Sequence, residues 1–151
     1  MEEKLEMLAE YKILGNELFE PMIITKELKI DPSEVYRKGD PWGNSIRKRQ
    51  CSAWILSEEC FDELDLSILI SRLLKVLMPK AEEIKEICAK NNLHTEIGCA
   101  VYIDVANSIT PILNFSEDII SKIHKLNTSV DIDIILLDSS PSSCERFEAN
   151  K

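Results

Sequence analysis

Apolar and polar residues alternate along three segments of the chain, which is the period of a half-buried β-strand. In residues 5–14 the odd positions are apolar and charged residues fall between them, although several good helix formers keep a helix open as the alternative. Residues 95–105 alternate most clearly, and residues 130–137 begin with alternation before becoming apolar throughout. Residues 51–57 are apolar on both faces around Trp54, which is typical of an interior strand. The pattern therefore predicts four strands.

Between these strands, apolar residues recur three and four positions apart, which predicts amphipathic helices. A short helix follows Pro21 and stops at Asp31-Pro32. A long helix begins at residue 62 or 65, is interrupted by Pro79 and resumes as far as residue 92, so it is one kinked helix or two joined end to end. A last helix begins at a Ser116 cap and stops at Asn127.

The predicted order is β-α-β-α(kinked)-β-α-β, which favours an α+β fold with a single sheet of about four strands and helices packed against it. Residues 36–50 lack periodicity and are predicted to form a long irregular loop. We expect one domain over residues 1–138 and a polar C-terminal tail over residues 139–151. A chain of 151 residues buries enough surface to fold without a metal or a disulfide. Its apolar stretches are far shorter than the ~20 residues of a membrane-spanning helix, so no membrane partner is expected.

Charge and cysteine usage narrow the class of partner. The chain has 18 Lys and Arg against 27 Asp and Glu, a net charge of -9, so its averaged surface repels phosphate backbones and we expect no nucleic-acid partner. Five cysteines at irregular spacings match neither a zinc site nor a complete set of disulfides. The acidic N-terminus leads into no apolar segment of a secretory signal. These features predict a soluble protein of the reducing cytoplasm.

One segment reverses the charge. Residues 37–49 carry a net charge of +4, so the remaining chain carries -13. Guanidinium groups bind phosphates, carboxylates and acidic partners in bidentate fashion; the alternative is a solvated loop that pairs with the acids of its own chain. Trp42 lies between a proline and a glycine and is predicted to be half exposed, whereas Trp54 is predicted to be core. The candidate residues for binding an anion or a partner are Arg37, Lys38, Asp40, Trp42, Arg47 and Arg49.

No catalytic, metal-binding or cofactor-binding constellation stands out. His94 and His124 have no metal ligand at helical spacing, and each is predicted to lie on the surface or to have its hydrogen bonds satisfied. Cys88 and Cys99 are predicted to be small core residues, although a Cys–His nucleophile pair is formally possible. Asp131 and Asp133 share one strand face and either repel each other or await a cation. We therefore predict no catalytic residue, metal or cofactor, and whether the protein is an enzyme stays open.

Several motifs in order resemble a known family. They are Pro21, residues 24–32, residues 36–40, Trp54 with residues 56–57, and residues 77–82. Together, over roughly residues 5–138, they resemble the bacterial family catalogued as domain of unknown function 4279. The resemblance implies an α+β domain of mostly bacterial, cytosolic proteins without an established activity, and no catalytic residues come with it. Some relatives have been suspected of acting as immunity proteins that neutralise toxins. The polar tail after Ser139 departs from the family pattern.

An acidic single domain of this kind suits an inhibitor of a basic protein, because opposite charges accelerate encounter. We therefore expect a non-enzymatic protein-binding module, an immunity-type inhibitor of a basic toxin. Its contact is predicted on the acidic helix face of Glu82, Glu83 and Glu86 or on the loop that carries Trp42. The alternative is a small-ligand or anion-binding domain that uses the basic loop 37–49. A homodimer through sheet edges is a further possibility.

Overall fold

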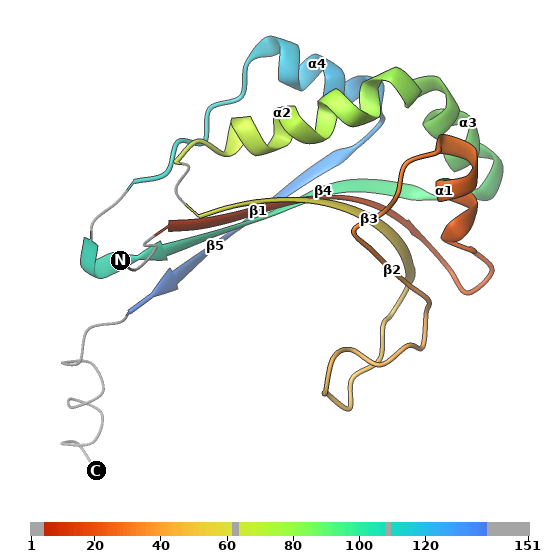
Figure 1. The fold of residues 1–151 in the computed structure, drawn as a ribbon, viewed down its shortest axis with the longest axis horizontal. Helices are drawn as coiled ribbons and strands as arrows, with labels where there is room; N and C mark the ends of the chain where they lie inside the picture. The colour runs from red at the N-terminus through yellow and green to blue at the C-terminus, as the bar shows by residue number, and fades with distance from the viewer. Residues whose placement is uncertain (1–4, 62–63, 108–109, 139–151) are drawn as a thin grey trace.

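The protein is an α+β fold in which helices cover one side of a single mixed sheet (Figure 1). The computed structural model describes residues 5–61, 64–107 and 110–138. The strands are β1 (Leu5–Gly15), β2 (Glu34–Tyr36), β3 (Ser52–Cys60), β4 (His94–Asp104) and β5 (Ser129–Leu137). The predicted tail at 139–151 lies outside the described residues.

The sheet order is β2-β3-β1-β4-β5. Strand β1 lies at the centre and pairs antiparallel with both β3 and β4, and β2 pairs antiparallel with β3. Strand β5 is parallel to β4, because α4 carries the chain back across the sheet between them. The two edges of the sheet are therefore β2 and β5.

The helices follow the predicted stripes. They are α1 (Met22–Leu28), α2 (Leu66–Leu77), α3 (Ala81–Asn91) and α4 (Glu117–Lys125), with 3-10 turns η1 (Met78–Lys80) and η2 (Val105–Asn107). Pro79 lies in η1, so α2 and α3 are two helices joined end to end, one of the two predicted forms. The Ser116 side chain accepts a hydrogen bond from the Ile119 N–H, and Asn127 has a positive φ, which confirms the predicted start and stop of α4. No helix among the described residues is long and apolar enough to cross a membrane.

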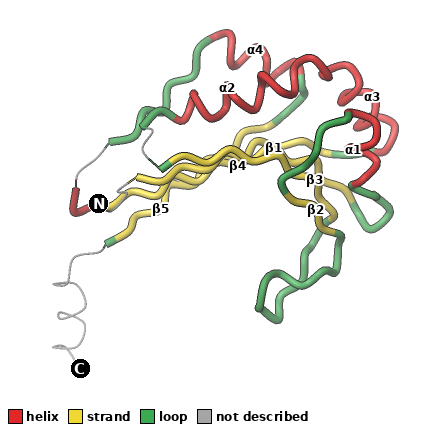
Figure 2. The backbone as a smooth tube through the Cα atoms, viewed as in Figure 1, coloured by secondary structure: helices red, strands yellow, loops and turns green. Residues whose placement is uncertain are grey.

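The core lies between the sheet and the helices. One face of β1, β3 and β4 packs against the apolar stripe of α2, and α4 lies beside α2 over the same face (Figure 2). Trp54 is fully buried, as predicted, and its indole N–H donates to the hydroxyl of Thr25 in α1. Helix α1 is thereby tied to the sheet and packs against α3 at one end of the molecule.

The structure corrects two sequence predictions. The sheet has five strands and not about four, because β2 adds a short edge strand after Pro32. Three residues are too few for a period-two pattern to be recognised in the sequence. Residues 37–50 form a loop, as predicted, but it is not irregular throughout, since Pro41 and Lys48 pair as an antiparallel bridge. They extend from β2 and β3 on the side of the sheet opposite the helices (Figure 1).

Candidate functional site

The basic loop, residues 37–50, is held by its own backbone. The Gly39 N–H donates to the Arg49 carbonyl at 2.9 Å, and the Arg49 N–H donates to the Asp40 carbonyl at 2.8 Å. The Asp40 carboxylate accepts a hydrogen bond from the Arg37 N–H at 2.8 Å, and Gly39 has φ 92°. Asp40 and Gly39 therefore shape a turn, since glycine adopts this φ without steric cost.

Three cations of the basic loop are paired with acids of the same chain, and the first two are Arg37 and Lys38. Arg37 forms an ion pair with Glu20, and Lys38 Nζ lies 3.2 Å from Glu17. The pKa of the Arg37 guanidinium is raised, first by its hydrogen bond to Glu20. The pKa of the Glu17 carboxyl is lowered, first by its own backbone N–H and then by Lys38. These contacts correspond to the alternative in which the loop pairs with its own chain.

Arg49 holds the middle of the basic loop. Its guanidinium lies 3.9 Å from the centroid of the Tyr36 ring and 4.9 Å from that of the Trp42 ring, and its Nη2 lies 3.2 Å from Glu34. Stacking on two rings stabilises a cation beyond its ion pair. Trp42 is 50% exposed, as predicted. The basic residues of this loop thus do not converge on a common anion site.

Arg47 is the remaining candidate residue of the basic loop. It is exposed, and its side chain has no ion-pair partner among the described residues; the same holds for its neighbour Lys48. Two adjacent exposed cations at a loop tip do not enclose a ligand.

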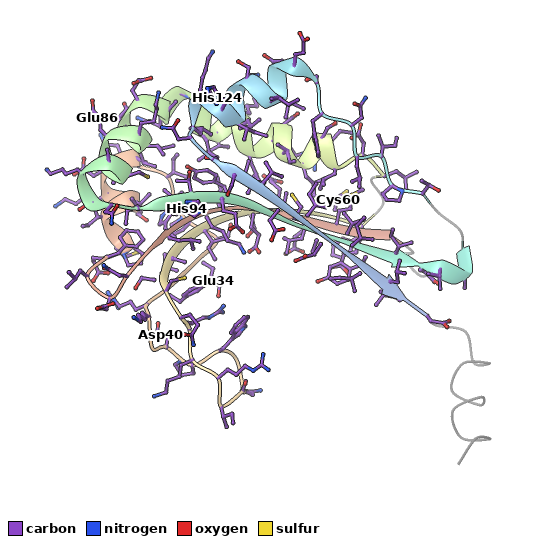
Figure 3. All side chains as sticks on the ribbon, turned by 180° about the vertical axis from the view of Figure 1, so that it is seen from behind. Glu34, Asp40, Cys60, Glu86, His94 and His124 are labelled. Carbon is purple, nitrogen blue, oxygen red and sulfur yellow. The ribbon has the colours of Figure 1, made fainter. Side chains whose placement is uncertain are left out.

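The predicted acidic helix face lies on α3, on the helical side of the molecule, where Figure 3 shows Glu86. Glu82, Glu83 and Glu86 are exposed, and Lys85 Nζ lies 3.9 Å from Glu82. A groove of about 430 Å³ between α1 and α3 is lined by both signs of charge, with Glu86 beside Lys90. The structure therefore brings lysines among these glutamates and weakens their field.

A hollow of about 260 Å³ brings Cys88 of α3 and His94 of β4 to one lining, together with Lys85 and Asn127. Burial raises the pKa of the Cys88 thiol to about 11, so the thiol is protonated at neutral pH. A nucleophilic cysteine requires the opposite shift. His94 and His124 are both exposed, as predicted, and Cys99 is buried, as predicted. The hollow thus offers no activated nucleophile.

The opposite side of the sheet carries a second set of charges that the sequence did not bring together. Opposed residues of neighbouring strands project to the same side, so the registers define which side chains share this surface. No described helix covers it (Figure 1). We call it the open face, and the basic loop lies on the same side of the sheet, at β2 and β3. The residues of the open face are Glu6, Leu8, Glu10, Lys12, Leu14, Glu34, Tyr36, Ala53, Ile55, Ser57, Glu59, His94, Glu96, Gly98, Ala100, Tyr102, Asp104, Ser129, Asp131, Asp133, Ile135 and Leu137.

Carboxylates dominate the strand positions of the open face, where Lys12 is the one lysine or arginine, and Arg49 of the basic loop adjoins them at Glu34 and Tyr36 of β2. Lys12 Nζ lies 3.9 Å from Glu10, and that carboxylate also accepts a hydrogen bond from Ser57. The lysine side chain lies over Gly98, where an added Cβ would come within 3.2 Å of Nζ. Gly98 therefore leaves room for the lysine in the middle of β4.

An apolar centre adjoins these carboxylates. The registers place Tyr102 between Glu6 and Ile135, and Ala100 between Leu8 and Asp133. Leu8, Tyr102 and Ile135 are partly exposed. The described residues contain no group of three or more metal-ligating side chains, and Asp131 and Asp133 belong to none. The open face thus combines an aromatic and aliphatic centre with acidic surroundings, a composition that suits a protein contact.

The comparisons with known proteins identify a family. The model of the family described as domain of unknown function DUF4279 matches residues 4–137. The chain belongs to this family. No curated protein and no solved structure shows a significant match. The family resemblance drawn from the motifs of this sequence is therefore confirmed, and the family carries no assigned activity in its description.

Sequence reasoning missed the open face, although part of the signal was present. The alternation of β1 and β4 already placed Glu10 and Glu96 on polar strand faces, and Asp131 with Asp133 on another. Nothing in the sequence said that β1 lies beside β4, or β4 beside β5. The acidic character of the surface arises only when these strand faces are laid next to one another.

Proposed function

We propose that this DUF4279 domain is a protein-binding module that takes up a basic protein on its open face, as an immunity-type inhibitor of a toxin would. The observation that carries the proposal is the composition of that face. Acidic residues from β1, β4 and β5 surround an apolar centre, and Lys12 is the one lysine or arginine at the open-face positions of these three strands.

Physical chemistry favours such a face as a contact for a basic partner. Exposed carboxylates on one surface attract a cationic protein over about a Debye length, which raises the association rate. Tyr102 and its apolar neighbours supply apolar surface whose burial against a partner stabilises the complex. Tyrosine is among the residues that contribute most binding energy at interfaces.

The open face supports this function better than the surfaces named from the sequence. The acidic residues of α3 are interspersed with Lys85 and Lys90, whereas those of the open face meet a single lysine. The alternative of an anion-binding domain loses support because Arg37, Lys38 and Arg49 already engage acids of their own chain. Cytoplasmic location and a protein partner both stay predictions.

The test compares two triple variants with the same change of charge. One variant carries Glu96→Gln, Asp131→Asn and Asp133→Asn on the open face. The control carries Glu82→Gln, Glu83→Gln and Glu86→Gln on α3. A basic protein captured by the wild-type chain from its native host at low salt is purified, and its affinity for each chain is measured by calorimetry at several salt concentrations.

We expect a one-to-one complex that weakens with salt. Each exposed charge at an interface contributes roughly 0.5–1 kcal/mol, so the open-face variant binds about tenfold or more weakly and the α3 variant binds like the wild type. If only the α3 variant loses affinity, the contact lies on the acidic helix face of α3 and not on the open face. Failure to recover any stoichiometric basic partner at low salt would remove the proposal.

A further inference from the structure

Strand β5 is an edge strand whose only charged residues are Asp131 and Asp133. Along its outer edge no described strand pairs with it, and its nine residues contain no proline, glycine, lysine or arginine. Natural sheets protect their edges with such residues or with very short strands, as β2 does here with three residues. The open backbone groups of β5 are therefore suited to pair with another extended segment.

The two sides of β5 differ in chemistry. On the helical side, Ile134 and Leu136 are 51% and 66% exposed, because the helices do not reach the C-terminal half of the strand, and Val130 near its start is 40% exposed. An apolar hollow of about 180 Å³ between α2, α4 and β5 continues this side, with Ile120 and Val130 in its lining. On the open-face side, the first half of the strand carries one serine, Ser129, and two exposed acids.

Those acids are Asp131 and Asp133, two positions apart in β5. The register places them opposite Gly98 and Ala100 of β4, which carry no charge of their own, and the Lys12 side chain of β1 lies over Gly98. A segment added outside β5 would place its alternate side chains directly opposite these carboxylates and its remaining side chains opposite Val130, Ile132 and Ile134.

We propose that the basic partner adds an extended segment of alternating basic and apolar residues to the outer edge of β5. The inference rests on the proposed function and specifies how the partner is held. Lysine or arginine side chains of the segment lie on the open-face side against Asp131 and Asp133, and its aliphatic side chains cover the exposed apolar residues of the helical side.

The charges of β5 favour a basic partner over a second copy of this chain. Two copies paired antiparallel through β5 would bring both aspartate pairs onto one surface that already carries Glu6, Glu10 and Glu96. Like charges on neighbouring strands destabilise the pairing, whereas opposite charges stabilise it.

The test uses the full chain and two capped eight-residue peptides that contain four lysines and four valines each. In one peptide lysine and valine alternate; in the other the lysines form one block and the valines another. Affinity is measured by fluorescence anisotropy, and amide hydrogen exchange of residues 129–137 is followed by NMR. Asp131→Asn with Asp133→Asn is compared with Glu82→Gln and Glu83→Gln, which make the same change of charge on α3.

We expect the alternating peptide to bind at least tenfold more tightly than the block peptide and to protect alternate amides of β5. The double aspartate variant should weaken it about tenfold, the effect of two cross-strand charge pairs, and the α3 variant should not. Two N-methylated forms of the alternating peptide distinguish strand pairing from charge alone. Each form is methylated on every second backbone nitrogen, so that one edge of the peptide or the other can no longer donate hydrogen bonds. If the peptide pairs with β5 as a strand, one of the two forms must fail to bind.

Three results would overturn the inference. Equal affinity of the two peptides without protection of β5 would show binding by charge alone, which leaves the open-face contact of the proposed function standing. Protection of β5 that rises with protein concentration in the absence of peptide would assign the edge to a second copy. If a basic partner captured from the host binds the chain but leaves the β5 amides unprotected, the contact lies elsewhere on the open face.

Discussion

Replacement of Gly15 by alanine tests the packing at the end of β1. An added Cβ would come within 2.6 Å of the Phe19 Cβ and 2.8 Å of the Leu93 side chain. Phe19 is a buried core residue, and its Cβ is fixed to the backbone, so it does not rotate away. The substitution therefore requires the chain after β1 to move from the core.

The magnitude follows from two opposing effects. Overpacking of a well-packed site costs about 1–3 kcal/mol. Alanine also restricts the unfolded chain, which restores roughly 0.4–1 kcal/mol. We expect Gly15→Ala to lower the free energy of unfolding by about 1–2 kcal/mol, and to lower Tm by about 2–8 °C in a chain of this size.

Gly98→Ala is the matched control, because it is the same substitution in another strand. There the added Cβ meets Lys12 Nζ at 3.2 Å, Lys12 Cε at 3.3 Å and Glu96 Oε1 at 3.4 Å, the far ends of two flexible side chains. The lysine can turn aside, so the free energy of unfolding should stay within about 0.5 kcal/mol of the wild type. Urea unfolding followed by circular dichroism measures both variants. Equal losses in the two variants would refute the argument that steric contact at Gly15 decides the cost.

Two further predictions concern thiol ionisation and the basic loop. Burial raises the pKa of Cys88 to about 11 and of Cys99 to about 12, so the stability that the protonated thiols contribute is fully present below about pH 8.5 and is lost as the pH rises toward 12. The free energy of unfolding, measured by urea titration from pH 8 to pH 11, should therefore fall less steeply with pH in Cys99→Ala than in the wild type, and parallel slopes would contradict the shift. Arg49→Lys removes the stacking on Tyr36 and Trp42, so acrylamide should quench the fluorescence of Trp42 more strongly. The fully buried Trp54 should not be quenched by acrylamide in either protein. Arg47→Lys should leave quenching unchanged, and an equal rise in both variants would show that the stacking does not hold the loop.

Local patterns were enough to predict most elements of the fold. The alternation in residues 95–105 predicted β4, and the stripe from Leu66 to Leu77 predicted a helix whose apolar side is buried. Ser116 and Asn127 predicted the ends of α4. These signals are local, since a period or a cap depends only on residues within a turn or two. Strand β2 has three residues, too few to show a period, and was therefore missed.

The basic loop shows where a sum of charges misleads. The sequence predicted an excess of cations over residues 37–49, which is correct as a count. The excess does not leave these cations available to a ligand, because three acids lie next to the loop in space. They are Glu17, Glu20 and Glu34, which pair with Lys38, Arg37 and Arg49. Whether a charge is available to a ligand depends on neighbours that no local pattern identifies.

The sequence by itself determined the class of fold, the family and the sidedness of β1 and β4, because these depend on residues close together in the chain. The tertiary structure alone decided which strands are neighbours, and therefore that the acids of β1, β4 and β5 share one surface. It also placed the apolar run of β5 at an open edge instead of in the interior. The physical reason is that strand order results from long-range pairing and packing of the whole sheet, and the charge of a surface is the sum over strands that only this pairing brings together.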